Sequence, residues 1–263
     1  MTHDNDRLTR NYFLTAGECD AEGRMPLPLV AERIIEVSTA HANELGIGYA
    51  TLVKHGIGWV LSRLSIEMVR YPGINEEYSL TTWIESINRR FSERNILITD
   101  ANGAVAGYAR SVWSAIDFAR RTGADLAGTG IEHCPVAVID CPIEKTPRIL
   151  APDPNVVGKE YTFRYCDLDF NRHVNTIRYL ELLMDQWTLE HYDAMETERV
   201  DLLFHHECRF GDTVSARICS PVDKMYDCEL SREGVRVVGA RFRFRNRQDV
   251  SQTAGSERPL SLR

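Results

Sequence analysis

The segment from Asp167 to Asn175 concentrates side chains that acid–base and nucleophilic chemistry require. It reads Asp-Leu-Asp-Phe-Asn-Arg-His-Val-Asn, with two carboxylates, two carboxamides and one imidazole. The polar cluster is expected at a helix entrance, where free backbone N–H groups and the helix dipole favour developing negative charge. Such a place suits the hydrolysis of an ester or a thioester. The helix is predicted from apolar side chains that recur directly after the segment, at the spacing of one buried face: Ile177, Leu180, Met184 and Trp187.

Asp169, Asn171 and His173 stand two residues apart in this segment. In an extended or irregular approach to a helix, alternate residues point to the same side, so a carboxylate, a carboxamide and an imidazole would share one surface. The alternative is that Asn and Asp side chains here cap the helix. Capping accounts for one such residue and not for the whole cluster. We therefore interpret these three as candidate catalytic residues and Asp167 as a structural or capping residue.

The pair Glu207-Cys208 is a second candidate. Alone in a strand, such a pair is usually structural, with the cysteine buried. It gains a functional meaning if the fold brings it against the helix entrance. The preceding His205 and His206 would face opposite sides of a strand, so we do not expect them to share a metal ion.

The overall composition excludes several functional classes. The chain of 263 residues is 43% hydrophobic, enough for a substantial core, and its net charge of −7 disfavours a general role in nucleic-acid binding. No apolar run is long enough to span a bilayer, and the polar N-terminus lacks the apolar segment of a signal peptide, so we expect a cytoplasmic protein without a membrane partner. The seven cysteines include no Cys-x-x-Cys pair, which argues against a disulfide framework or a structural zinc site.

The chain shows the same order of elements twice. In each half a polar loop, at residues 18–23 and 167–175, precedes a helix and then several strands, and Asn102-Gly103 marks one hairpin between strands. The first helix is expected to stop at Gly46, and the second to run to about Tyr192. Two local matches support a duplication: Arg70-Tyr71-Pro72-Gly73 with Arg209-Phe210-Gly211, and Gly103, Ala109 and Arg110 with Gly234, Ala240 and Arg241.

One helix followed by antiparallel strands, twice over, predicts an α+β architecture in which each sheet wraps around its own helix and the two sheets pair side by side. The loop at residues 19–25 lacks the Asp-x-Asn-x-His pattern, so we expect the chemistry in the second half and a substrate pocket in the first. Prolines interrupt the region between the halves. Four segments are therefore expected: an N-terminal unit at residues 1–130, a connector at 131–158, a C-terminal unit at 159–250 and a polar tail at 251–263.

Three other features have ordinary structural explanations. His41 lies on the apolar face of the first helix and is expected to line the core or a tunnel. The alternation over residues 241–245 predicts a half-buried strand with Phe inward and Arg outward rather than an RNA-binding surface. The basic clusters Arg89-Arg90-Arg94 and Arg120-Arg121 are usually only solvated charge, and they offer places where an acidic partner could dock.

These motifs resemble the acyl-acyl-carrier-protein (acyl-ACP) thioesterases of plants and bacteria over residues 10–245. That family carries Asp-Leu-Asp-x-Asn-x-His-Val-Asn-Asn before the helix of its second half, and residues 167–175 match it, with Thr176 in place of the final Asn. Its Arg-Glu-Cys segment, followed by Asp, appears here as His206-Glu207-Cys208 with Asp212. The supporting matches in the first half are Trp59-Val60 with Arg63, Arg70-Tyr71-Pro72, and Ser111-Val112-Trp113.

The resemblance implies an α+β tandem double hotdog fold and the hydrolysis of fatty acyl-ACP thioesters to free fatty acid and holo-ACP, which ends chain elongation. It implies no cofactor, and it makes the acidic acyl carrier protein the partner, received by one of the Arg clusters. Two alternatives stay open, a thioesterase for coenzyme A esters and a non-catalytic acyl-binding protein. A monomer and a homodimer both fit, because a double hotdog already contains the pairing that single-hotdog proteins obtain by dimerising.

The resemblance leaves two assignments of roles. In one, Cys208 is the nucleophile, His173 is its base and Asn171 orients the imidazole. In the other, which we favour, Asp169 attacks the thioester or activates water, while His173 and Glu207 assist proton transfer. Asn171 or the N–H groups at the helix N-terminus would then stabilise the oxyanion.

Overall fold

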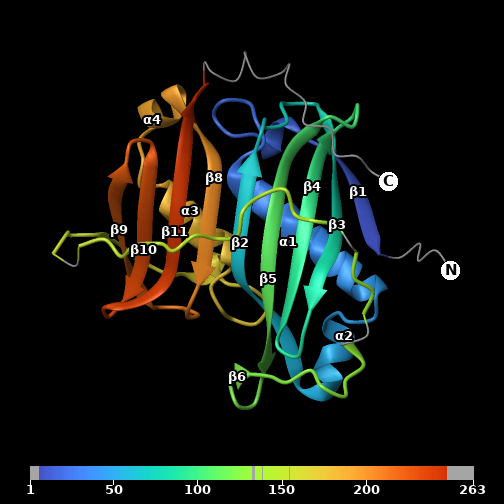
Figure 1. The fold of residues 1–263 in the computed structure, drawn as a ribbon. Helices are drawn as coiled ribbons and strands as arrows, with labels where there is room; N and C mark the ends of the chain where they lie inside the picture. Colours follow the sequence, from blue (N-terminus) through green and yellow to red (C-terminus); the bar gives the residue numbers. More distant parts are fainter. Residues whose placement is uncertain (1–5, 132–133, 138, 154, 248–263) are drawn as a thin grey trace.

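The computed structural model describes residues 6–131, 134–137, 139–153 and 155–247, and over these residues it forms one antiparallel sheet of eleven strands (Figure 1). The strand order is β1-β3-β4-β5-β2-β8-β11-β10-β9-β7, with β6 paired to β5. The order is symmetric about the junction of β2 and β8, so each half of the sheet repeats the other. This arrangement is the expected tandem double hotdog. The predicted tail at 251–263 lies outside the described residues.

The strands of the first half precede the connector in the sequence. They are β1 (Arg7–Phe13), β2 (Ile57–Met68), β3 (Glu77–Ile87), β4 (Phe91–Asp100), β5 (Val105–Asp117) and β6 (Thr122–Gly123). Those of the second half are β7 (Lys159–Thr162), β8 (Met195–Phe204), β9 (Thr213–Val222), β10 (Met225–Arg232) and β11 (Val235–Asn246). The α-helices are α1 (Leu27–Glu44), α2 (Tyr49–Leu52), α3 (Thr176–Met184) and α4 (Leu189–Ala194). Short 3-10 turns span Ala16–Glu18, Val53–His55 and Tyr165–Asp167.

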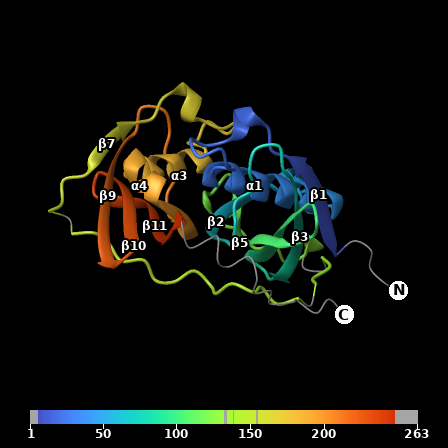
Figure 2. The same ribbon diagram turned by 90° about the horizontal axis from the view of Figure 1, so that it is seen from above.

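Helices α1, α3 and α4 lie on one face of the sheet, and the connector between the halves runs along the other face (Figure 2). The apolar face of α1 is buried as its spacing predicts, and the helix stops before Gly46, whose φ of 72° suits glycine. The connector is tied to the sheet by hydrogen bonds, including one from the Trp83 indole to the Ile139 carbonyl and one from Arg199 to the Glu144 carbonyl. No helix in the described ranges is long and apolar enough to cross a membrane.

The two halves meet where β2 pairs with β8, from Arg63 opposite Leu203 to Glu67 opposite Arg199. Ser65 faces Asp201 at the centre of this pairing, and its hydroxyl donates a 2.6 Å hydrogen bond to the Asp201 carboxylate. The sheet therefore continues without a break from one half to the other.

The second of the two predicted local matches holds in three dimensions. Gly103 and Gly234 both have positive φ, at 81° and 78°, in the hairpins that lead into β5 and β11. Arg110 and Arg241 then occupy corresponding positions, since they pair across the sheet with Ser65 and Asp201. The Phe side chains of β11 are buried and its arginines form ion pairs, as the alternation predicted: Arg241 with Asp227, Arg243 with Glu198, and Arg245 with Glu196.

The predicted second helix is wrong in its length. It ends at Met184 instead of near Tyr192, and α4 begins separately behind the N-cap Thr188, whose hydroxyl accepts the His191 N–H. Trp187 lies in the break and packs edge-on against Phe242 and Phe244, with ring centroids 4.9 and 5.0 Å away. This aromatic packing competes with a continuous helix.

Candidate active site

Residues 169–173 form a tight turn built on the Asp169 carboxylate. Its Oδ1 accepts hydrogen bonds from the backbone N–H groups of Asn171 at 2.8 Å and His173 at 3.0 Å. The Asp169 N–H donates to the His173 carbonyl at 2.8 Å, and Arg172 takes a φ of 62°. The candidate residues are therefore arranged by a turn rather than by the alternation of an extended segment. The Asn171 side chain is exposed at the turn and makes no hydrogen bond within the described residues.

The first half contains the same turn, built on Asp20. The Asp20 carboxylate accepts the N–H groups of Glu22 at 3.1 Å and Arg24 at 2.9 Å, and the Asp20 N–H donates to the Arg24 carbonyl. Gly23 takes the positive φ here, at 69°. The acidic residue of the turn is thus common to both halves. What distinguishes the second half is Asn171 where Glu22 stands, and His173 where Arg24 stands.

The segment beside each turn also corresponds between the halves. The Met25 N–H donates to the Pro72 carbonyl, as the Val174 N–H donates to the Cys208 carbonyl, both at 2.8 Å. Glu207 therefore occupies the position of Tyr71. The predicted match of Arg70 with Arg209 is wrong by three residues, because the bridges Arg24–Gly73 and His173–Arg209 place Gly73, not Arg70, at the position of Arg209.

This segment brings Glu207 against His173. The Nε2 atom of His173 lies 3.3 Å from Oε2 of Glu207, with 19% of the His173 side chain and 50% of the Glu207 side chain exposed. Glu207 and Cys208 lie in a loop after β8, not within a strand as predicted. Helix α3 begins nearby, capped by Asn175, whose side chain accepts the Ile177 N–H. An imidazole and a carboxylate at this distance can share a proton, and the imidazole remains accessible to a substrate.

Asp167 has the structural surroundings that the sequence predicted. Its buried carboxylate accepts the Arg164 N–H at 2.6 Å and the Tyr161 hydroxyl at 3.0 Å, and it forms a 2.8 Å ion pair with Arg178. These contacts leave it to hold the loop before α3.

Cys208 lies behind the site rather than in it. Its exposed fraction is 0%, its N–H donates to the Tyr179 hydroxyl at 2.9 Å, and burial raises the pKa of its thiol. A nucleophilic cysteine needs an accessible thiol that ionises readily. The geometry therefore argues against the thiol mechanism.

Substituting Cys208 tests this preference directly. We expect Cys208→Ala to keep kcat/KM within about threefold of wild type and to lower the free energy of unfolding by about 1 kcal/mol, since it deletes only a small buried group. The measurement is thioester hydrolysis together with urea denaturation. A loss of about a hundredfold or more in kcat, with the folded state intact, would restore the thiol as nucleophile.

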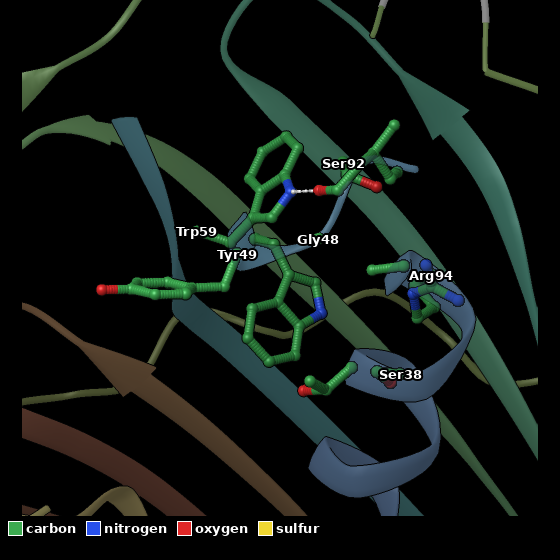
Figure 3. Close-up of a pocket in the computed structure, with 10 residues that line it drawn as sticks. Ser38, Gly48, Tyr49, Trp59, Ser92 and Arg94 are labelled. Atoms are coloured by element: carbon green, nitrogen blue, oxygen red, sulfur yellow. Dashed lines mark hydrogen bonds between the residues drawn. The ribbon is translucent and has the colours of Figure 1, made fainter. Parts of the chain in front are cut away.

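A pocket opens between α1 and the sheet of the first half (Figure 3). Its wall includes the Trp59 indole, which donates to the Ile47 carbonyl at 3.0 Å, and Tyr49, whose ring meets that of Phe170 edge-on with centroids 5.9 Å apart. Because Phe170 belongs to the turn, the pocket adjoins the candidate site. The lining residues are Ser38, Thr39, Ala42, Ile47, Gly48, Tyr49, Trp59, Ser92, Arg94 and Trp113.

Sequence reasoning missed the polar members of this pocket. Ser38, Ser92 and Arg94 are buried there, although Arg94 was expected in a surface cluster. His41 is buried as predicted, with its Nδ1 only 2.7 Å from Arg94 Nη1. The available signal was that Ser38 and His41 share the buried face of α1 with apolar residues, and that Arg94 alternates inward with Ile96 and Ile98.

Comparisons with known proteins identify the family of the two halves and agree with their fold. Residues 5–128 match the acyl-ACP thioesterase N-terminal domain family, and residues 151–249 match the corresponding C-terminal domain family. The crystal structure of an acyl-ACP thioesterase from Bacteroides thetaiotaomicron is 32% identical, with a TM-score of 0.86 over 93% of this chain and 100% of that one. The 12:0-ACP thioesterase from Umbellularia californica, at 16% identity and a TM-score of 0.82 over 94% and 99% of the two chains, shares the fold.

Among curated sequences, the chloroplastic oleoyl-acyl carrier protein thioesterase of Coriandrum sativum is 25% identical over 85% of this chain. The match covers 65% of that relative, so the chain spans just under two thirds of its length. The fold and the paired turns define a double hotdog protein. Within that class, the two domain matches show that the chain belongs to the acyl-ACP thioesterase family.

Proposed function

We propose that this protein hydrolyses the thioester between a fatty acyl chain and the phosphopantetheine arm of acyl carrier protein, releasing free fatty acid and holo-ACP. The observation that carries the proposal is the His173–Glu207 pair, which stands in the second half only and adjoins the pocket through Phe170 and Tyr49. The first half keeps the turn without these two residues, and it supplies the pocket for the acyl chain.

The reaction needs a water molecule to lose a proton as it attacks the thioester carbonyl. In our proposal the Nε2–H of His173 faces Glu207, so Nδ1 is the atom that takes the proton from water. Glu207 stabilises the imidazolium that forms, and the imidazolium then returns a proton to the leaving sulfur. The Asn171 amide or N–H groups at the start of α3 stabilise the oxyanion. Asp169 holds the turn that positions His173, because its Oδ1 is already engaged by two N–H groups.

The function is tested by measuring release of free fatty acid from a series of acyl-ACP substrates and from the matching coenzyme A esters. We expect kcat/KM to be at least about tenfold higher with the carrier-linked esters. Preference for the coenzyme A esters would support the alternative thioesterase. Tight binding of acyl-ACP without turnover would support a non-catalytic acyl-binding protein.

The rim of the site offers a surface for an acidic carrier protein. The arginines Arg164, Arg172 and Arg209 are exposed around the turn, beside the exposed rings of Phe170 and Phe210. The predicted clusters fit less well. Arg94 is buried, Arg89 is ion-paired with Asp125, and Arg120 lies near Asp117. We place the carrier on the rim, because cations there attract acidic side chains and the phosphate of the arm.

Removing two rim charges tests this docking. The double variant Arg172→Asn/Arg209→Gln is expected to raise KM for acyl-ACP by about tenfold at low salt and to leave hydrolysis of the small substrate acyl-pantetheine unchanged. Asn is chosen at position 172 because it tolerates the positive φ of that residue. Arg120→Gln, an exposed arginine away from the rim, is the matched control. An equal effect on both substrates would show that the rim shapes the site and does not bind the carrier.

The cytoplasmic location remains a prediction from the sequence, and a monomer and a homodimer both remain compatible with it.

A further inference from the structure

The end of the pocket formed by Arg94 and Ser38 is polar. Only 3% of Arg94 is exposed, and its Nη1 lies 2.7 Å from Nδ1 of His41 and 3.3 Å from Oγ1 of Thr82. Because a guanidinium only donates, the ring nitrogen of His41 that faces it must accept. Burial lowers the pKa of Arg94 to about 10, so the group keeps its charge at neutral pH. Within the described residues, no carboxylate lies at ion-pairing distance from Arg94.

Ser38 adds a second polar group at the same end. Its side chain is 3% exposed, and within the part of the chain that the structure describes its hydroxyl has no hydrogen-bond partner. Ser92 lines the same pocket and is also buried. A plain alkyl chain filling this space would leave the Ser38 hydroxyl without an acceptor and would bring no counter-charge to Arg94, which is unfavourable for buried groups.

The two ends of the pocket differ in character. In Figure 3, the Tyr49 side chain points away from Arg94 and Ser38, which lie together at the other side of the pocket. Tyr49 contacts Phe170 of the catalytic turn, so the thioester end of a substrate lies at the Tyr49 side. The far end of the acyl chain then meets Arg94 and Ser38.

We propose that this pocket binds acyl chains that carry an acceptor oxygen, as a hydroxyl or a carboxylate, at the end remote from the thioester, and that Arg94 and Ser38 bind this oxygen. The proposal rests on the proposed function for the identity of the ligand as an acyl thioester. It goes further in naming a distal oxygen subsite, which a pocket selective only for chain length would not need. A hydrogen bond to a buried charged group changes affinity by about tenfold to a hundredfold.

The test measures binding independently of catalysis. Amide analogues of acyl-pantetheine, in which nitrogen replaces the thioester sulfur, are prepared as a ladder of chain lengths in three forms: unsubstituted, ω-hydroxy and ω-carboxy. Calorimetry gives Kd for wild type, Arg94→Met and Ser38→Ala. Arg90→Met, at an exposed arginine in the bend just before β4, is the matched control.

At the best-fitting length, wild type is expected to bind an oxygenated analogue at least about tenfold more tightly than the unsubstituted one. Arg94→Met should abolish or reverse this ratio, Ser38→Ala should reduce it by about threefold, and Arg90→Met should leave it unchanged. The ω-hydroxy and ω-carboxy arms show which oxygen the site takes. If Arg94→Met does not fold, the ratio of Kd values for unsubstituted and oxygenated analogues in wild type and in Ser38→Ala still tests the subsite.

Equal or tighter binding of the unsubstituted analogues by wild type at every length would overturn the proposal. The same ladder of true thioesters separates this inference from the proposed function. A binding preference without hydrolysis would leave the subsite standing and remove the thioesterase. Hydrolysis without a binding preference for oxygenated chains would support the thioesterase and remove the subsite.

Discussion

Replacing His173 by alanine is expected to lower kcat for acyl-ACP hydrolysis by about a thousandfold, within the range that general acid–base catalysis contributes. The imidazole is the group at the turn that can both accept a proton from water and deliver one to the leaving sulfur. Its Nε2 lies 3.3 Å from the Glu207 carboxylate, which stabilises the protonated form. Glu207→Gln keeps the size of that side chain but removes its charge, and we expect a loss of about a hundredfold. Steady-state kinetics with acyl-ACP gives both values.

Two matched variants complete this test. His206→Ala removes an exposed imidazole next to Glu207 and should leave kcat unchanged. Asp169→Asn keeps an oxygen that accepts the N–H groups of the turn, so it isolates the contribution of the negative charge. We expect kcat of this variant to stay within about tenfold of wild type. If Asp169→Asn instead loses as much activity as His173→Ala while its thermal midpoint is retained, the Asp169 carboxylate carries the attack and His173 assists it.

Removing the carboxylate at the junction of the halves is expected to lower the free energy of unfolding by about 3–5 kcal/mol. Asp201 is 2% exposed, accepts the Ser65 hydroxyl, and receives hydrogen bonds from Arg199 Nε at 3.0 Å and Nη2 at 2.9 Å. In Asp201→Ala the buried Arg199 keeps Glu67 as an ion-pair partner, while its closest counter-charge is gone. Urea denaturation monitored by fluorescence measures the change.

The matched control lies on the same strand. Glu198→Ala breaks a more exposed ion pair with Arg243 and should cost less than about 1 kcal/mol. Ser65→Ala removes one hydrogen bond and should fall between the two, near 1 kcal/mol. Asp201→Ala unfolding at the wild-type midpoint would mean that the charges at the junction are solvated in solution, contrary to the structure.

Much of the fold follows from local patterns in the sequence. The apolar spacing from Leu27 to Val37 predicts α1, and Asn102-Gly103 predicts the hairpin between β4 and β5. These features depend on neighbouring residues, whose periodicity or turn chemistry is visible directly. The break after Met184 was not predictable in this way, because it depends on Trp187 packing against the distant Phe242 and Phe244.

The candidate site shows the same division. The motif at residues 167–175 located the candidate residues, but it predicted neither the turn that arranges them nor the approach of Glu207 to His173, which depends on a loop that follows β8. The register of the first internal match was three residues out, because only backbone hydrogen bonds reveal that Tyr71 corresponds to Glu207. Arg94 was predicted to be an exposed charge because it belongs to a basic cluster in the sequence. Its burial comes from strand alternation and from the helix above it, and composition shows neither.

Position 24 differs from its counterpart, position 173, in a way that is possible only because the two copies are joined in one chain. In a dimer of identical subunits every substitution appears twice, so a catalytic histidine cannot be exchanged in one copy and kept in the other. Here Arg24 occupies the place that His173 holds in the second half, and its Nη1 lies 2.7 Å from the buried Glu196 at the start of β8. At this position the first half therefore has an ion pair that connects it to the second half. Covalent linkage thus allows one copy of the turn to stabilise the contact between the halves while the other copy carries the imidazole.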